Sequence, residues 1–119
     1  LDESFVSALD TGAIFAFFQS DIGKRMKNAD KVAREVKFFT DVAACEIFPE
    51  IDESVKDEKV LLQGVIDCYF EEGGEIVIID YKTGSMDRPE YEKQVEFYAK
   101  GLSKVLRKPV KETVVYPLI

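Results

Sequence analysis

The chain has 119 residues and a formal net charge of −7, from 23 acidic and 16 basic residues. This length suits one domain with a modest core, and the share of hydrophobic residues, 46%, is ordinary for a globular protein. The acidic balance argues against a stand-alone nucleic-acid binder, which normally presents a basic footprint. It is compatible with a metal site, or with a module to which a larger machine delivers the substrate.

Several classes of site and location are excluded by what the sequence lacks. It contains no histidine, which rules out histidine bases and histidine metal ligands within the chain. Cys45 and Cys68 form no C-x-x-C pair, so cysteines alone cannot hold zinc or an iron–sulfur cluster, and we interpret them as buried or half-buried thiols. No apolar run approaches the roughly 20 residues of a membrane span. The start, Leu1-Asp2-Glu3, lacks a signal peptide and an initiator Met. We therefore expect a cytoplasmic piece of a longer protein, with no membrane contact.

Residues 1–29 are predicted to form a helical lead-in to a folded core over residues 30–119. The segment 13–18 is apolar nearly all round, which predicts burial in the core or, alternatively, contact with a partner. Ser20 or Asp21 can cap a second short helix that runs into the basic stretch 24–27. We interpret that stretch as a solvated helix end favoured by the helix dipole, with a DNA-backbone contact as the alternative.

Three strands are predicted in the middle of the chain. Alternation predicts a strand over 32–39, with Val32, Val36 and Phe38 on one face and Glu35 on the other. After an acidic loop over 52–59, a strand over 60–70 turns at Glu71-Glu72-Gly73-Gly74 into a strand over 75–81. The continuous apolar run 76–79 indicates a strand that is buried on both faces.

The rest of the chain is predicted to form a helix and a last strand. The helix covers about 88–106, with an apolar stripe that includes Val95, Leu102 and Val105. Pro109 ends it, and a strand follows over 111–116. The order α-β-β-β-α-β predicts an α/β (α+β) fold with a mixed sheet of about four strands flanked by helices.

Two carboxylates and one ammonium are expected to meet at the end of this sheet. Asp80 and Lys82 share a strand face because they are two residues apart, and pairing of the strands brings Asp67 beside Asp80. Such a group suits a divalent metal and a phosphate. The alternative is a surface ion pair of Asp80 and Lys82, which contributes little. Carboxylates that interrupt apolar strands are, however, costly to bury without a cation.

Three motifs carry a resemblance to a known family. They are G-x-x-D at 64–67, D-Y-K at 80–82 and Q-x-x-x-Y at 94–98. In this order they resemble the RecB-type branch of the PD-(D/E)xK nucleases, and most closely the C-terminal nuclease domains of AddA-type (RexA-type) helicase–nuclease subunits. The resemblance covers roughly residues 30–119 and rests on the combination, because each motif alone is weak.

The resemblance implies a restriction-endonuclease-like core and a Mg²⁺- or Mn²⁺-dependent DNA exonuclease without an iron–sulfur cluster. Asp67 and Asp80 are implied as metal ligands, and Lys82 as the catalytic lysine. Gln94 and Tyr98 are implied to support the site or the DNA, with helix packing as an equal alternative. Glu35 lies where relatives often carry an acid, and an edge-strand salt bridge is its alternative role.

The resemblance also implies the setting. Helicase domains of the same chain would feed single-stranded DNA to the site during double-strand break repair and recombination, in complex with an AddB-type (RexB-type) partner. Relatives carry a further histidine ligand upstream, so we expect that this ligand precedes Leu1 and that the isolated chain is weakly active or inactive. The alternatives are a stand-alone or phage-type nuclease, and a catalytically silent binding module.

Overall fold

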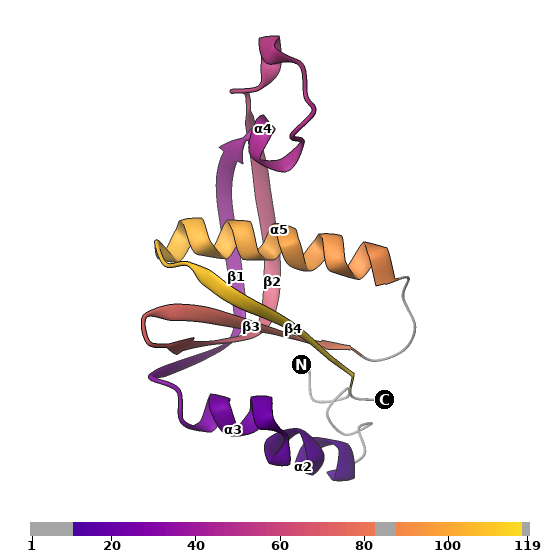
Figure 1. The fold of residues 1–119 in the computed structure, drawn as a ribbon, viewed down its shortest axis with the longest axis vertical. Helices are drawn as coiled ribbons and strands as arrows, with labels where there is room; N and C mark the ends of the chain where they lie inside the picture. The colour runs from indigo at the N-terminus through magenta and orange to yellow at the C-terminus, as the bar shows by residue number, and fades with distance from the viewer. Residues whose placement is uncertain (1–10, 83–87, 118–119) are drawn as a thin grey trace.

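The computed structural model describes residues 11–82 and 88–117, and only the backbone of residues 11 and 88–91. The elements follow one another along the chain as helices, a long hairpin, a further strand, a helix and a last strand (Figure 1). They are α2 (Thr11–Gln19), α3 (Asp21–Lys27), β1 (Lys31–Ala43), α4 (Ala44–Ile47), the 3₁₀ turn η1 (Glu53–Val55), β2 (Lys59–Glu72), β3 (Glu75–Lys82), α5 (Arg88–Leu106) and β4 (Val110–Pro117).

The four strands form one mixed sheet in the order β1-β2-β3-β4. The β1–β2 and β2–β3 pairs are antiparallel, whereas β4 returns parallel to β3 after the α5 crossover. In Figure 1, α5 covers one face of the sheet and α2 and α3 cover the other. This arrangement confirms the predicted fold class. None of the described helices is both long and apolar enough to cross a bilayer.

Two apolar clusters, one on each face of the sheet, make up the core. The cluster under α2 and α3 contains Phe17, Met26 and Phe70, and the cluster under α5 contains Ile66, Ile78 and Leu102. The β3 residues Ile76 to Ile79 are at most 1% exposed, as expected for a strand covered on both faces. Cys68 is a buried free thiol and Cys45 a half-buried one, as predicted.

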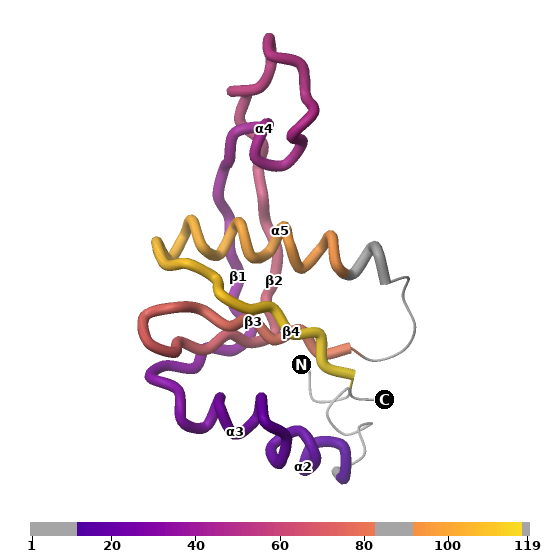
Figure 2. Tube along the Cα trace, viewed as in Figure 1, coloured from indigo at the N-terminus to yellow at the C-terminus, as the bar shows by residue number. Residues whose placement is uncertain are grey.

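The outer halves of β1 and β2 project beyond the sheet as an arm, which spans residues 36–66 and carries α4 and η1 at its tip (Figure 2). The prediction ended the first strand at Phe39, but β1 continues to Ala43 because Thr40 to Ala43 pair with Leu62 to Lys59. The arm contributes to the elongated dimensions of the molecule, 53 × 33 × 22 Å.

Two predictions of burial on helices were wrong. In α2 only Phe17 is deeply buried among the described side chains, whereas Phe15 is 67% exposed, because the sheet covers a single side of this helix. In α5 Val105 is 47% exposed, and Leu106 packs on the core in its place. The apolar pattern of the sequence therefore located both helices but misassigned some of their buried positions.

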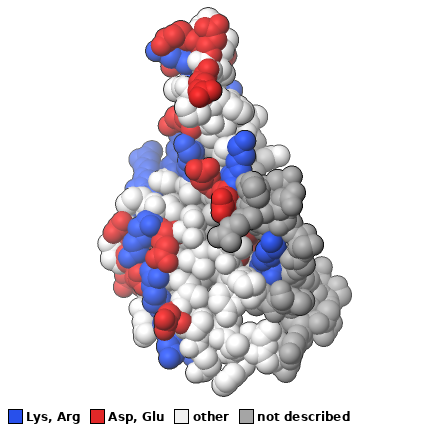
Figure 3. Space-filling view, turned by 45° about the vertical axis from the view of Figure 1, so that its right-hand side comes forward, with Lys and Arg blue, Asp and Glu red and all other residues white. Residues whose placement is uncertain are grey.

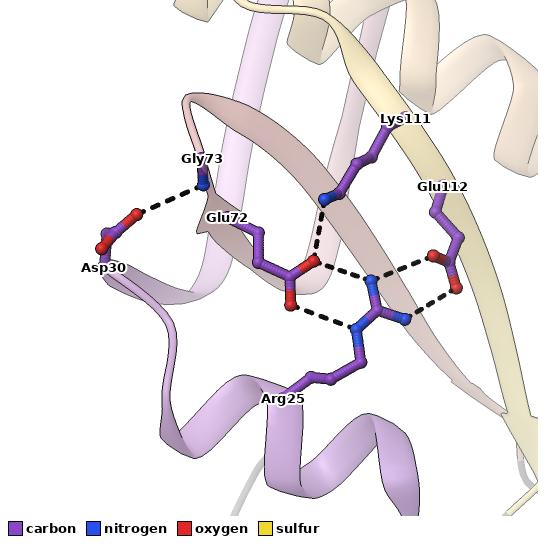
Figure 4. Close-up of polar contacts among 6 residues, drawn as sticks. All are labelled: Arg25, Asp30, Glu72, Gly73, Lys111 and Glu112. Carbon is purple, nitrogen blue, oxygen red and sulfur yellow. Dashed lines mark hydrogen bonds and ion pairs between the residues drawn. The ribbon is translucent and has the colours of Figure 1, made fainter.

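Within the basic end of α3, Arg25 is the centre of an ion-pair hub (Figure 4), whereas Lys24 and Lys27 are exposed, as predicted for a solvated helix end. The Arg25 guanidinium donates to both carboxylate oxygens of Glu72, at 2.9 and 3.1 Å, and to both of Glu112, at 3.1 Å. Lys111 adds a 2.8 Å ion pair with Glu72. These contacts tie α3 to the end of β2 and to β4. No local pattern indicated them, because the partners of Arg25 lie 47 and 87 residues away.

This hub predicts a specific acid sensitivity. Hydrogen bonds from Arg25 and Lys111 lower the pKa of Glu72 to about 2. A lowered native pKa stabilises the fold above the unfolded value of 4.5, and that contribution is lost as the pH falls towards 2. We expect the stability of Glu72→Gln, measured by urea unfolding, to decline less steeply than wild type between pH 4.5 and 2. Parallel pH profiles of the two proteins would contradict the assignment.

Candidate active site

Asp67 and Asp80 meet where the β2–β3 ladder ends. The last paired residues are Cys68 and Ile79, so the next position on each strand places the two aspartates opposite each other. The Tyr81 backbone N–H donates to Asp67 Oδ2 at 2.9 Å and fixes that carboxylate across the strand end. Burial, followed by the negative charge of Asp67, raises the pKa of Asp80 to about 6. The two predicted acids are therefore brought together as expected.

Lys82 lies on the same face of β3 as Asp80. Between them Tyr81 faces the other way, where its ring packs edge-on against Phe17 with centroids 5.2 Å apart. Phe17 also contacts the Tyr116 ring of β4, at 4.9 Å. Side chains alternate along a strand, so Asp80 and Lys82 face the α5 side. The aromatic contacts beneath Tyr81 hold this strand end in place.

Glu35 occupies an unusual backbone position beside Asp67. Its φ is +52°, in the left-handed region that non-glycine residues rarely adopt. The register places it opposite Asp67, between the pairs Arg34–Cys68 and Val36–Ile66. The structure thus puts Glu35 next to the acidic pair in the sheet. No group of three or more acidic or cysteine side chains able to hold a metal occurs within residues 11–82 and 92–117.

The alternation of side chains between the two faces of the sheet is interrupted at Glu35 and around Asp67. The faces predicted for the residues of β1 are therefore corrected. Val32 packs in the cluster under α2 and α3, whereas Val36 and Phe38 pack under α5. On β2 the same change occurs around Asp67: Ile66 and Tyr69 both face α5. The single face predicted for Val32, Val36 and Phe38 was wrong because the left-handed residue turns the strand. The same turn starts the arm.

Gln94 and Tyr98 lie one turn apart on α5 and are bonded to each other. Gln94 Nε2 donates to the Tyr98 hydroxyl at 2.9 Å. The Tyr98 ring packs edge-on against Phe38, with centroids 5.6 Å apart, and lies directly over Gly64 of β2. The packing role predicted as an alternative for Tyr98 is therefore present. Gly64 and Tyr98 together bring α5 onto the strand that carries Asp67.

Close contact at Gly64 makes this position sensitive to a methyl group. A Cβ on Gly64 would lie 2.5 Å from Tyr98 Cε1, so the ring must move. We expect Gly64→Ala to lower the free energy of unfolding by about 1–3 kcal/mol, measured by chemical denaturation. The double variant Gly64→Ala/Tyr98→Leu should recover part of that loss. A single variant as stable as wild type would show that the ring is not clamped.

A groove beside Tyr98 was not predicted from the sequence. This groove has a volume of about 530 Å³ and lies between the arm and α5. The arm contributes Phe38, Leu61, Leu62 and Gln63, and α5 contributes Lys93, Gln94, Phe97 and Tyr98. Phe97, at a variable position within the Q-x-x-x-Y motif, was the signal that could have indicated it. No acidic side chain is among these lining residues.

The two aspartates are a donor set that fits a divalent cation. Their oxygens are the hard ligands that Mg²⁺ prefers, and Mg²⁺ is usually held by one or two carboxylates while keeping several waters. Burial and, after it, the negative charge of Asp67 raise the pKa of Asp80, so a second charge at this position is held at a cost. A cation between them would offset this cost. Asp67 and Asp80 would therefore hold such an ion.

On the face of the molecule seen in Figure 3, the described charged side chains do not form a broad basic surface, because acidic and basic side chains are interspersed there. This pattern agrees with the net charge of −7. It offers little long-range attraction for a polyanion.

Comparisons with known proteins agree with the motifs. The model of the PD-(D/E)XK nuclease superfamily matches residues 3–118. An ATP-dependent helicase/nuclease subunit from Clostridium kluyveri (strain ATCC 8527) is 38% identical over 98% of this chain and 10% of the relative. The protein of the same name from Clostridium botulinum (strain Loch Maree) is 41% identical over 87% of this chain and 8% of the relative. The chain thus spans about a tenth of the length of these relatives. With the family model covering nearly all of it, the chain belongs to the PD-(D/E)XK nuclease superfamily.

Proposed function

We propose that this chain is the nuclease domain of an ATP-dependent helicase–nuclease and hydrolyses phosphodiester bonds of single-stranded DNA. The observation that carries the proposal is the meeting of Asp67 and Asp80 at one strand end, with Lys82 on the same face. Because the chain belongs to a nuclease superfamily, the reaction proposed for this acidic pair is the hydrolysis of a phosphodiester bond. We also propose that the chain is the C-terminal part of a longer protein. Within it, residues 1–29 are a helical lead-in and residues 30–119 are the nuclease core.

The roles of the residues follow from their positions. Asp67 and Asp80 would hold a divalent ion, Mg²⁺ or Mn²⁺, which would lower the pKa of a bound water and offset charge on the scissile phosphate. The Tyr81 N–H keeps the Asp67 carboxylate oriented. Lys82 places its ammonium group against the attacking water or the phosphate. Gln94 and Tyr98 support the strand beneath the site through the contact over Gly64.

The setting is inferred from the relatives. Because those proteins are named as subunits of an ATP-dependent helicase/nuclease, we infer that motor domains of the same polypeptide deliver the strand during double-strand break repair and recombination. Such delivery removes the need for a basic surface on this acidic chain. We further infer a cytoplasmic location, a partner of the AddB type and a further metal ligand outside residues 1–119.

Cleavage of linear single-stranded DNA tests the proposal. The protein that carries this chain should degrade such DNA in the presence of Mg²⁺ or Mn²⁺ and should not do so in EDTA. Asp67→Asn should reduce cleavage and metal affinity together, whereas Lys82→Met should reduce cleavage alone. Asp52→Asn, an exposed change on the arm, is the matched control. Full activity of both Asp67→Asn and Lys82→Met would refute the assignment.

One observation favours a second candidate, a catalytically silent binding module. The described residues offer two carboxylates at the site and no third His, Cys, Asp or Glu side chain that completes a metal-binding group with them. Titration calorimetry distinguishes the candidates. A silent module would bind no Mn²⁺ at millimolar concentration even within the longer protein, whereas a nuclease domain would bind it there.

A further inference from the structure

We propose that the groove between the arm and α5 holds an unpaired nucleobase of the DNA strand that is cleaved at the acidic pair. This inference rests on the proposed function, because it takes the substrate to be single-stranded DNA. It assigns a role to Phe97, Lys93 and Gln63, which are not among the defining residues of the three motifs.

The chemistry of the groove suits a base. Phe97 offers a half-buried aromatic ring, and bases stack on such rings whatever their sequence. Gln63 and Gln94 supply amide donors and acceptors for base edges. The volume of about 530 Å³ lies within the range of roughly 300–1,000 Å³ typical of small-molecule sites.

The charge of the groove suits a nucleotide, which carries a phosphate beside its base. Lys93 lies at the groove and can meet that phosphate, and no acidic residue is among the described residues that line the groove. The chain as a whole is acidic, with a net charge of −7. A polyanion that passes along the molecule therefore meets a locally favourable site here.

The position of the groove links it to the acidic pair. Tyr98 forms part of its lining and rests on Gly64. Gly64 precedes Asp67 by three residues on β2, a distance of about 10 Å along a strand. A base in the groove and a phosphate at Asp67 therefore belong to nearby nucleotides of one strand. Figure 2 shows α5 crossing the base of the arm, and the groove lies between these two elements.

The groove wall is held in place before any ligand arrives. The Tyr98 hydroxyl accepts from Gln94, and its ring is packed against Phe38. A rigid aromatic site loses little entropy when a base enters. In a duplex the faces of the bases are stacked on one another, so the groove would select unpaired DNA.

Fluorescence anisotropy with a labelled oligo-dT, in EDTA so that no metal acts, tests the groove. We expect Phe97→Ala to weaken binding by about 5- to 150-fold, the range seen when one stacked base loses its aromatic partner. Phe97→Tyr should retain the affinity. Phe39→Ala is the matched control, since Phe39 is 64% exposed on the same arm but does not line the groove.

An abasic scan makes the test independent of any loss of stability. One abasic site is moved along the oligonucleotide, and each version is measured with wild type and with Phe97→Ala. The proposal requires one position at which the abasic site weakens wild-type binding and Phe97→Ala adds no further loss. Equal affinities of Phe97→Ala and Phe39→Ala, or purely additive losses at every position, would overturn it. A protein segment would then be the better candidate occupant.

The two proposals fail separately. If cleavage depends on metal and on Asp67 while Phe97→Ala binds DNA as wild type does, the role of the groove is refuted and the nuclease function stands. If binding depends on Phe97 but the protein never cleaves DNA, the nuclease function is refuted and the role of the groove stands.

Discussion

Asp80→Asn should abolish cleavage and at the same time stabilise the metal-free protein. The amide removes a metal ligand, and we expect a loss of roughly 10³-fold or more in rate, since two carboxylates carry the ion. It also removes a charge that the fold holds at a cost: burial and Asp67 raise the pKa of Asp80 from 3.8 to about 6. After allowance for the half-exposed site, this corresponds to a gain of about 1–2 kcal/mol at pH 7, or roughly 4 °C in Tm for each kcal/mol.

The sign of the pH dependence makes this result specific. A carboxyl whose native pKa is raised stabilises the fold fully below its unfolded pKa of 3.8 and loses that contribution as the pH rises through about 6. The advantage of Asp80→Asn over wild type should therefore be small at pH 4 and complete at pH 7, in EDTA. Asp57→Asn, on the exposed arm, should show no such trend. A variant less stable than wild type at pH 7 would contradict the account.

Gly23→Ala should be more damaging than a methyl group added at Gly64 or Gly101, where the nearest atoms belong to side chains. A Cβ at Gly23 would lie 2.1 Å from the Phe17 carbonyl oxygen and 2.9 Å from the Phe18 Cα, and both atoms belong to the backbone. Alanine gains up to about 1 kcal/mol in helix propensity, but the overlap forces α2 away from α3. We expect a net loss of about 3 kcal/mol, which is about 10 °C in Tm, measured by thermal unfolding.

The effect of Gly23→Ala should reach the site. Phe17 moves with α2, and its ring supports Tyr81, the residue between Asp80 and Lys82. Metal affinity should therefore fall together with stability. Gly73→Asn is the control, because Gly73 has a φ of +59° that asparagine tolerates and no atom within 4 Å of an added Cβ. If Gly23→Ala were as stable as Gly73→Asn, the packing of α2 on α3 would differ from that described.

The order of elements could be predicted because local signals define it. The turn at 71–74, the continuous apolar run of β3 and the stripe of α5 each depend on neighbours a few residues away. The meeting of Asp67 and Asp80 followed in the same way, since a short hairpin fixes the register of its two strands. These features required no long-range information.

What could not be predicted depends on contacts between distant segments. Arg25 meets Glu112 only after the sheet has formed, so nothing near Arg25 distinguishes it from a solvated cation. The change of face along β1 depends on the left-handed backbone of Glu35. Nothing in the alternating sequence around Glu35 indicates this conformation. The groove exists because the arm and α5 converge, and neither segment shows it alone. The roles of Asp67, Asp80, Lys82, Gln94, Tyr98 and Glu35 stay predictions.

The arm has a consequence for how proteins of this kind can diverge. Its outermost part, from Asp52 to Glu58, lies beyond α4, whose Glu46 carbonyl accepts a hydrogen bond from Lys100 of α5. Chain added or removed at that end leaves the sheet register and the acidic pair unchanged. Surface segments of this sort accept insertions most readily. Evolution can therefore vary the length of this segment, and an experimenter can place a fluorophore or an affinity tag there, without disturbing the chemistry about 25 Å of strand away.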